Sequence, residues 1–250
     1  MDSVHVISLA RSQARRAAFA LANAHLRYEF VDAVDGTALT PEQVAASGHF
    51  APGLPYIPGA IGCALSHLGA WERAIALGRP ITVAEDDAVF RHDFHEKQWR
   101  LLSELPPHWD IVMWGWNFDC VLSLNLMPGV TPSVLACDQT QLRRSLAGFQ
   151  QGHLMPALLP LNSCFGTPAY TISASGARRF RAMCFPLRPM EVAVAVAGQP
   201  VPNVGIDVAM NRAYPLTGSY ACVPPLAATP NDHGASTVRH ISPLADPPPG

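Results

Sequence analysis

Residues 81–90, with the sequence ITVAEDDAVF, constrain the fold of this chain more than any other stretch. Four small or β-branched residues lead into three consecutive carboxylates, Glu85, Asp86 and Asp87, after which the chain becomes apolar again. This pattern predicts a buried strand that ends at a turn. Because α/β folds bind ligands beyond the ends of such strands, we expect the acidic triplet to lie at a binding site.

The acidic triplet is typical of a site for a divalent cation. Neighbouring carboxylates repel one another and resist ionising together unless a cation shares their charge. Alternate strand residues share a face, so Glu85 and Asp87 are expected to point to one side and Asp86 to the other. A Glu-x-Asp pair on one face suits Mg²⁺ or Mn²⁺ carrying a diphosphate. A turn whose acidic residues are only solvated, or cap the next helix, is the alternative.

Length and composition limit the remaining choices. At 250 residues the chain can bury one large core but is too short for two independent domains of average size. Hydrophobic residues make up 49% and charged residues 14%, which indicates a globular rather than a disordered chain. The formal net charge of −2 gives no reason to expect a nucleic-acid partner.

The six cysteines are scattered, without a Cys-x-x-Cys pair. They suit neither a zinc site nor a disulfide framework and are typical of reduced core residues. Residues 4–9 are too short for the apolar region of a signal peptide, and no apolar run is long enough to span a bilayer. We therefore expect a cytoplasmic protein, either soluble or peripheral to the inner face of the membrane, with six free thiols.

Patterns typical of strands and helices alternate along the first half of the chain. Strands are predicted at residues 4–9, 28–33, 81–85 and 110–114, and helices after Ser12, after Thr40, over 61–77 and over 94–105. This order predicts an α/β fold with a mainly parallel sheet and right-handed crossovers. Residues 119–166 show no clean period, but a strand at 169–172 and a helix at 175–184 are expected. Residues 241–250 are expected to be a disordered tail.

Six segments within about residues 4–180 form an ordered series of motifs. In chain order they are VISLARSQARR, FVDAVDG, GAIGCALSHLGAW, VAEDDAVF, WDIVMWG and GTPAYTISASGARRF. The series resembles glycosyltransferase family 25, which includes bacterial lipooligosaccharide galactosyltransferases and relatives of the collagen galactosyltransferases. The resemblance implies a GT-A-like (Rossmann-like) fold, a nucleotide-sugar donor that is most often UDP-galactose, and a divalent metal such as Mn²⁺ or Mg²⁺. It also implies transfer with inversion to an oligosaccharide or glycolipid acceptor, in lipopolysaccharide or other surface-glycan biosynthesis.

The resemblance divides the chain into two halves of one domain and gives the acidic triplet a role. Residues 1–118 would bind the nucleotide sugar, and the irregular residues 119–240 would form the acceptor side. Glu85, Asp86 and Asp87 match the family's acidic signature, which stands where other GT-A enzymes carry Asp-x-Asp. It implies that Glu85 and Asp87 hold the metal, with Glu85 and Asp86 on the donor diphosphate. The metal would offset charge on the departing nucleoside diphosphate.

Five further residues are candidates for binding the donor or its metal. Arg11 and Arg15 follow the first predicted strand, where helix N–H groups favour anions and arginine adds a bidentate partner. Solvated arginines in a first helical turn are the alternative. Ser66 and His67 belong to the family's pattern and are given donor-site roles by the resemblance, although His67 follows the apolar face and would otherwise be a core histidine. His233 is a candidate for a further metal or diphosphate ligand.

The acceptor side needs a base, because displacement with inversion requires a group that deprotonates the attacking hydroxyl. Asp207 stands where the family usually carries an aspartate before a helix, so we expect it to be the catalytic base or to bind the acceptor; a helix N-cap is the alternative. Trp114 and Trp116 could stack on a sugar ring or could simply be buried.

Two other functions are compatible with the sequence. A nucleotidyltransferase would use a similar sheet and acidic pair, but it usually needs a glycine-rich phosphate loop, and SLARSQARR contains no glycine. A catalytically inactive sugar-binding or scaffold protein is the third possibility. The intact acidic triplet is evidence against it.

Overall fold

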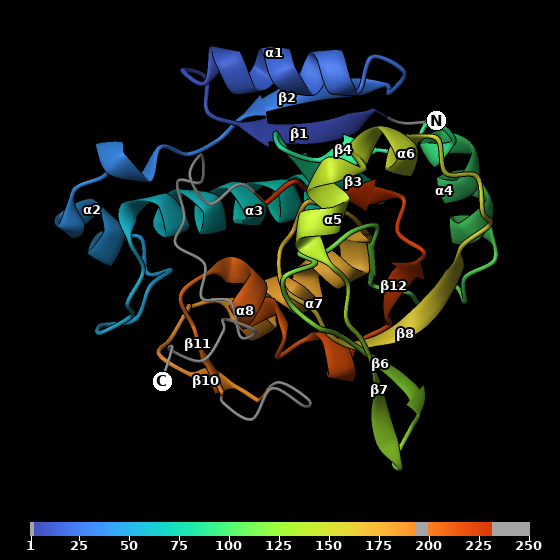
Figure 1. Ribbon diagram of the computed structural model, residues 1–250. Helices are drawn as coiled ribbons and strands as arrows, with labels where there is room; N and C mark the ends of the chain where they lie inside the picture. The colour runs from blue at the N-terminus through green and yellow to red at the C-terminus, as the bar shows by residue number, and fades with distance from the viewer. Residues whose placement is uncertain (1–2, 194–199, 232–250) are drawn as a thin grey trace, which may run out of the picture.

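The computed structural model describes residues 3–193 and 200–231 and shows an α/β fold with helices on both faces of a nine-stranded sheet (Figure 1). The strand order is β2-β1-β3-β9-β5-β12-β8-β6-β7. These strands are β1 (Val4–Ser8), β2 (Tyr28–Asp32), β3 (Ile81–Glu85), β5 (Ile111–Met113), β6 (Leu122–Met127), β7 (Thr131–Leu135), β8 (Ala157–Ser163), β9 (Ala169–Ile172) and β12 (Ser219–Val223). Two small two-stranded sheets pair β4 (Val89–Phe90) with β13 (Ala227–Ala228), and β10 (Glu191–Val192) with β11 (Val201–Pro202).

The helices alternate with strands in the first half, as predicted. They are α1 (Gln13–Ala22), α2 (Pro41–Ala46), α3 (Pro58–Leu77), α4 (Phe94–Ser103), α5 (Gln139–Arg144), α6 (Leu146–Gln150), α7 (Ala174–Cys184) and α8 (Ile206–Met210), with short 3₁₀ turns η1 (Gly36–Ala38) and η2 (Tyr214–Leu216). The observed ends differ from the expected ones by a few residues, as is usual for boundaries set by fraying and capping.

The sheet is mostly parallel in the direction of its strands. β2, β1, β3, β5, β12 and β6 run one way, and β9, β8 and β7 run the other. The predicted fold class is therefore confirmed. One arrangement was not foreseen: β9, from the second half of the chain, lies antiparallel between β3 and β5.

Two layers of apolar side chains cover the sheet, because alternate strand residues point to opposite faces. Val83 packs with Leu68 and Trp71 of α3 and with α7 in the larger cluster. Ala84, the next residue, packs on the other face with Phe94 of α4 and with α1. In Figure 1, α1 lies over β1 and β2, while α3 crosses the middle of the molecule above α7.

Helix α3 carries the residues that matter most below, and its ends follow simple rules. Pro58 occupies the first turn, where its missing N–H costs nothing. The helix ends at Gly78, whose φ of 65° is left-handed and suits glycine. It begins earlier than residue 61, where the apolar period starts.

Residues 119–166, where no period was visible, form β6, β7, α5, α6 and β8. The β6–β7 hairpin extends from the body of the molecule (Figure 1), so β6 is buried at its start and exposed at its end. β7 contains Pro132, which is tolerated at a sheet edge. Neither strand therefore shows a clean alternation.

All six cysteines are free, as predicted, and Cys120, Cys164, Cys184 and Cys222 are buried. Within the described residues, no helix combines the length and the apolar character needed to cross a bilayer.

Candidate active site

A pocket of about 350 Å³ lies where β1 and β3 end, and it brings both halves of the chain together. Its walls include the acidic triplet, the start of α1, the start of α3, and residues 205–207 from the second half. The described chain ends at Asn231, which also lines the pocket. His233 lies outside the described residues.

All three residues of the acidic triplet line the pocket, so the expectation that Asp86 points away from the other two is wrong. β3 ends at Glu85 and the chain turns, with the N–H of Ala88 donating to the carbonyl of Glu85 at 3.2 Å. The strand alternation therefore stops there. Asp86 does not point away from its neighbours, since Asp86 and Asp87 both face Arg15 and all three carboxylates line the pocket.

Asp86 is the buried member of the triplet and is held by the first half of the chain. Ser8 Oγ donates to its Oδ2 at 2.7 Å, and Arg15 Nε donates to its Oδ1 at 2.8 Å. Arg15 stands in the first turn of α1, so this ion pair joins α1 to the end of β3. Asp86 thus shapes the pocket through Arg15.

Asp87 is the member whose charge is least satisfied. Its Oδ1 is buried and accepts no hydrogen bond from any described residue, while its Oδ2 lies 3.5 Å from Arg15 Nη2. Burial, together with the negative charges of Glu85 and Asp86, raises the pKa of Asp87 to about 7, although the positive charge of Arg15 opposes the shift. An orphaned carboxylate oxygen beside a second carboxylate fits a divalent cation.

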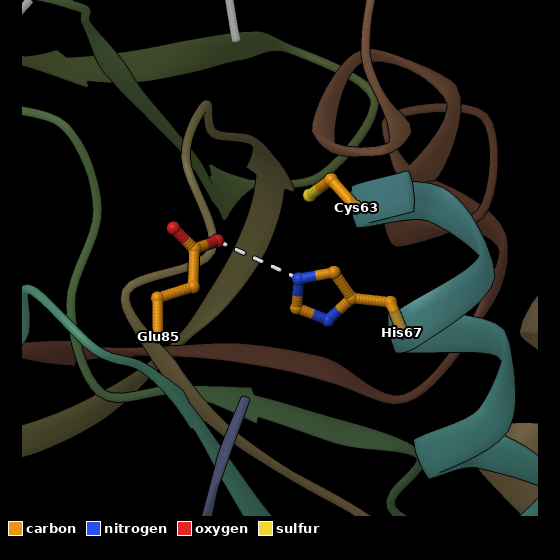
Figure 2. A group of neighbouring side chains, drawn as sticks. All are labelled: Cys63, His67 and Glu85. Atoms are coloured by element: carbon orange, nitrogen blue, oxygen red, sulfur yellow. Dashed lines mark ion pairs between the residues drawn. The ribbon is translucent and has the colours of Figure 1, made fainter. Parts of the chain in front are cut away.

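Glu85 is the last residue of β3 and also lines the pocket. Thr167 Oγ1 donates to Glu85 Oε1, and His67 Nε2 lies 3.5 Å from the same oxygen. Figure 2 shows the imidazole of His67 reaching from α3 toward this carboxylate. His67 is fully buried, and its Nδ1 lies 2.9 Å from the hydroxyl of Tyr170.

Cys63, His67 and Glu85 could form a second set of metal ligands, since their ligand atoms lie within 4.8 Å of one another (Figure 2). Burial raises the pKa of the Cys63 thiol well above its ordinary value. A thiol that keeps its proton is a poor ligand, because metals bind the thiolate. The carboxylates Glu85 and Asp87 are therefore the better candidates, and as hard oxygen ligands they suit Mg²⁺ or Mn²⁺.

The other donor-site candidates, Arg11 and Ser66, lie on the pocket wall and already contact other residues of the chain. Arg11 pairs with Asp35 and remains half exposed at the pocket. Ser66 Oγ accepts from the N–H of Val34 at 2.9 Å and donates to the carbonyl of Gly62 at 2.7 Å. Ser66 therefore joins the loop after β2 to helix α3.

Two glycines let that loop approach the beginning of α3. A Cβ on Gly36 would lie 1.8 Å from the carbonyl oxygen of Pro58, and one on Gly62 would lie 2.4 Å from that of Val34. Gly59 and Ala60, in the first turn of α3, consequently line the pocket. The N–H groups of a helix start attract anions. The approach joins segments far apart in sequence, so no local pattern signals it.

Asp207 lies in the part of the wall contributed by the second half. It stands in the first turn of α8, and its Oδ2 accepts from the N–H of Gly166 at 2.9 Å. Gly205 is the N-cap, so the alternative role of Asp207 as N-cap is wrong. Among the other late carboxylates, Glu191 is exposed in β10 and is not part of the pocket wall.

The two tryptophans considered for stacking on a sugar ring are core residues instead. Trp114 and Trp116 are buried in the core, with exposed fractions of 0% and 1%, and cannot stack on a sugar in this structure. Gly166 and Thr167, which precede β9, are pocket residues that sequence reasoning missed as site residues. They stand within a recognised segment, but only the pairing of β9 with β3 places them beside Glu85.

A mostly parallel sheet with a carboxylate-rich pocket beyond its strand ends defines an α/β protein whose binding site lies at the strand ends. Residues 1–196 match the model of Glycosyltransferase family 25 (LPS biosynthesis protein). The chain belongs to glycosyltransferase family 25.

Two curated relatives from mouse illustrate the range of the family. The chain is 30% identical over 195 residues to "Inactive glycosyltransferase 25 family member 3", a match covering 72% of this chain and 29% of that protein. It is 31% identical over 128 residues to "Procollagen galactosyltransferase 2", covering 46% of this chain and 20% of that protein. The chain thus spans less than a third of the length of these relatives.

Proposed function

We propose that this chain is a metal-dependent inverting glycosyltransferase that moves galactose from UDP-galactose to a saccharide acceptor. The observation that carries the proposal is Asp87, whose buried Oδ1 has no hydrogen-bond partner among the described residues and lies in the same pocket as Glu85. One relative is named as a procollagen galactosyltransferase, and that name supports galactose as the sugar transferred. The family description supports a role in lipopolysaccharide, lipooligosaccharide or other surface-glycan synthesis.

The donor half, residues 1–118, would bind the nucleotide sugar. Glu85 and Asp87 would hold Mn²⁺ or Mg²⁺, with His233 as a further candidate ligand; the bound ion would supply positive charge that offsets the charge developing on the leaving UDP. Arg11, Arg15 and the start of α3 would attract the diphosphate. Asp86 contributes by holding Arg15 in place.

The acceptor half, residues 119–240, would supply the base. The acceptor hydroxyl attacks the anomeric carbon, its proton passes to Asp207, and the bond from that carbon to the diphosphate oxygen breaks with its electron pair leaving on UDP. Attack from the face opposite the leaving group inverts the configuration. The N–H of Gly166 fixes Oδ2 of Asp207, which holds the carboxylate in one orientation.

An inactive sugar-binding protein is the second candidate, because several relatives are named as inactive or probable inactive members of the family. Such a protein would have no need for an unsatisfied carboxylate beside two others, an arrangement that costs stability. The intact triplet and Asp207 therefore favour an enzyme.

A thermal-shift screen of UDP-sugars with and without Mn²⁺ tests the donor side of this proposal. We expect UDP-galactose to raise the melting temperature, and to do so only when Mn²⁺ is present. Asp87→Asn is the matched variant and should lose the effect of the metal. Stabilisation of the wild-type protein that is equal with and without Mn²⁺ would argue against a metal-held diphosphate.

A further inference from the structure

A chain of buried hydrogen-bonding groups leads from helix α3 to the carboxylate of Glu85. Trp71 Nε1 lies 3.0 Å from the hydroxyl oxygen of Tyr170, and that oxygen lies 2.9 Å from His67 Nδ1. His67 Nε2 lies 3.4 Å from Thr167 Oγ1, which in turn donates to Glu85 Oε1. Trp71, Tyr170 and Thr167 are not among the site residues predicted from the sequence.

Three elements of the fold hold this chain together. His67 and Trp71 are one turn apart on α3, so both face Tyr170 of β9. β9 pairs with β3, with Tyr170 opposite Val83, and this pairing brings Thr167 beside Glu85. The side chains between Glu85 and the core are shielded from water, since His67, Trp71 and Tyr170 are fully buried and Thr167 is 3% exposed.

Trp71, at one end of the chain, can only donate, and this fixes the direction of the hydrogen bonds from Trp71 to Tyr170 and from Tyr170 to His67. An indole N–H can only donate, so the oxygen of Tyr170 accepts from Trp71. Burial raises the pKa of the Tyr170 hydroxyl far above its ordinary value, so the hydroxyl keeps its single proton. The acceptor within hydrogen-bonding distance of that proton is His67 Nδ1, which must then be the unprotonated nitrogen.

Glu85, at the other end of the chain, can only accept, and this independently indicates where His67 carries its proton. A carboxylate can only accept, so the proton of Thr167 points to Glu85 and its oxygen presents lone pairs to His67. A bare Nε2 would face the oxygens of Thr167 and Glu85 without a proton between them. The imidazole therefore carries its proton on Nε2, toward the pocket.

We propose that Tyr170 and Trp71 are positioning residues, which hold His67 as the Nε2–H tautomer so that His67 and Thr167 together orient the carboxylate of Glu85. In this tautomer Nε2 has no lone pair, so His67 acts as a hydrogen-bond donor to the pocket and neither as a metal ligand nor as a base. The consequence for metal binding rests on the proposed function. The tautomer itself does not.

The tautomer can be measured directly on the metal-free protein. Two-bond ¹H–¹⁵N correlation spectra of protein with ¹⁵N-labelled histidine distinguish the two ring tautomers, and loss of one signal in His67→Gln assigns the residue. We expect wild-type His67 to show the Nε2–H pattern and Tyr170→Phe to show a mixture of tautomers. A wild-type Nδ1–H pattern would overturn the inference.

Mn²⁺ affinity, titrated in the presence of UDP, tests the consequence. Loss of an outer-shell partner typically weakens metal binding about 10- to 100-fold, and we expect Tyr170→Phe to fall in that range. Thr171→Val is the matched control, because Thr171 is the next residue of β9 and bonds Thr82, Gln98 and Trp114 instead of the pocket. It should leave Mn²⁺ affinity unchanged.

The outcomes separate the two proposals. Equal loss of Mn²⁺ affinity in Tyr170→Phe and Thr171→Val would mean that Tyr170 acts only through stability, and would overturn the positioning role. If wild-type protein binds no Mn²⁺ with UDP, the proposed function fails, and the histidine spectra alone then decide the tautomer.

Discussion

Arg15 Nε donates to Asp86 Oδ1 at 2.8 Å and thereby ties the first turn of α1 to the end of β3. The pair divides the acidic triplet into members with different tasks. Asp86 is buried and neutralised, whereas Asp87 retains a buried oxygen without a hydrogen-bond partner among the described residues. Arg15, which we propose as a ligand of the donor diphosphate, is thus held in place by one carboxylate of the motif.

Arg15→Ala should destabilise the fold, because it leaves the buried carboxylate of Asp86 without its cation. We expect a loss of about 1–3 kcal/mol in the free energy of unfolding, measured in urea. The double variant Arg15→Ala/Asp86→Asn should recover most of that loss, since the uncompensated charge is gone. Strictly additive effects of the two substitutions would show that the pair is not coupled.

Asp87→Asn should abolish transfer and yet stabilise the metal-free protein. Because the folded-state pKa of Asp87 is raised from 3.8 to about 7, the folded protein binds this proton more tightly than the unfolded chain. Stability is therefore lost as the pH rises through this interval, and the whole cost is present above it. The variant should melt higher than wild type at about pH 8 and equally at about pH 3. A lower melting temperature at the higher pH would contradict this account.

Asp207→Asn tests the base. The amide keeps an oxygen that can accept from the N–H of Gly166, so the fold should survive, but basicity is lost. We expect turnover to fall by roughly two or more orders of magnitude, with UDP-galactose binding nearly unchanged. Full turnover combined with earlier melting would make Asp207 a structural residue. Asp232, outside the described residues, would then become the next candidate.

Gly62→Ala and Gly69→Ala form a matched pair on helix α3. A Cβ on Gly62 meets the carbonyl of Val34, whereas one on Gly69 meets nothing within 4 Å. Gly69→Ala should stabilise the fold by about 0.5–1 kcal/mol, as expected in a helix interior. Gly62→Ala should destabilise it and weaken UDP binding, because the loop after β2 must move away from the helix start. Equal effects on melting temperature would rule out the close approach as the reason for Gly62.

The sequence predicted what local patterns encode and missed what distant pairing creates. The strand of residues 81–85, helix α3 and the location of the acidic triplet at a strand end all follow from apolar periods and turn signals. The predicted orientation of Asp86 was wrong, because the alternation of side chains along a strand does not show where the strand ends. Thr167 and Tyr170 reach the site only because β9 pairs with β3, and sequence alone carries no sign of that pairing.

Metal-dependent transfer is tested most directly by measuring the release of UDP from UDP-galactose by the purified protein, with water or a saccharide as acceptor. Mn²⁺ and EDTA are the two arms of one experiment, run on the wild-type chain. If Glu85 and Asp87 hold the ion, UDP release requires Mn²⁺ and stops in EDTA. UDP release at the same rate in EDTA, or none from UDP-galactose or any other UDP-sugar with Mn²⁺ present, would contradict it.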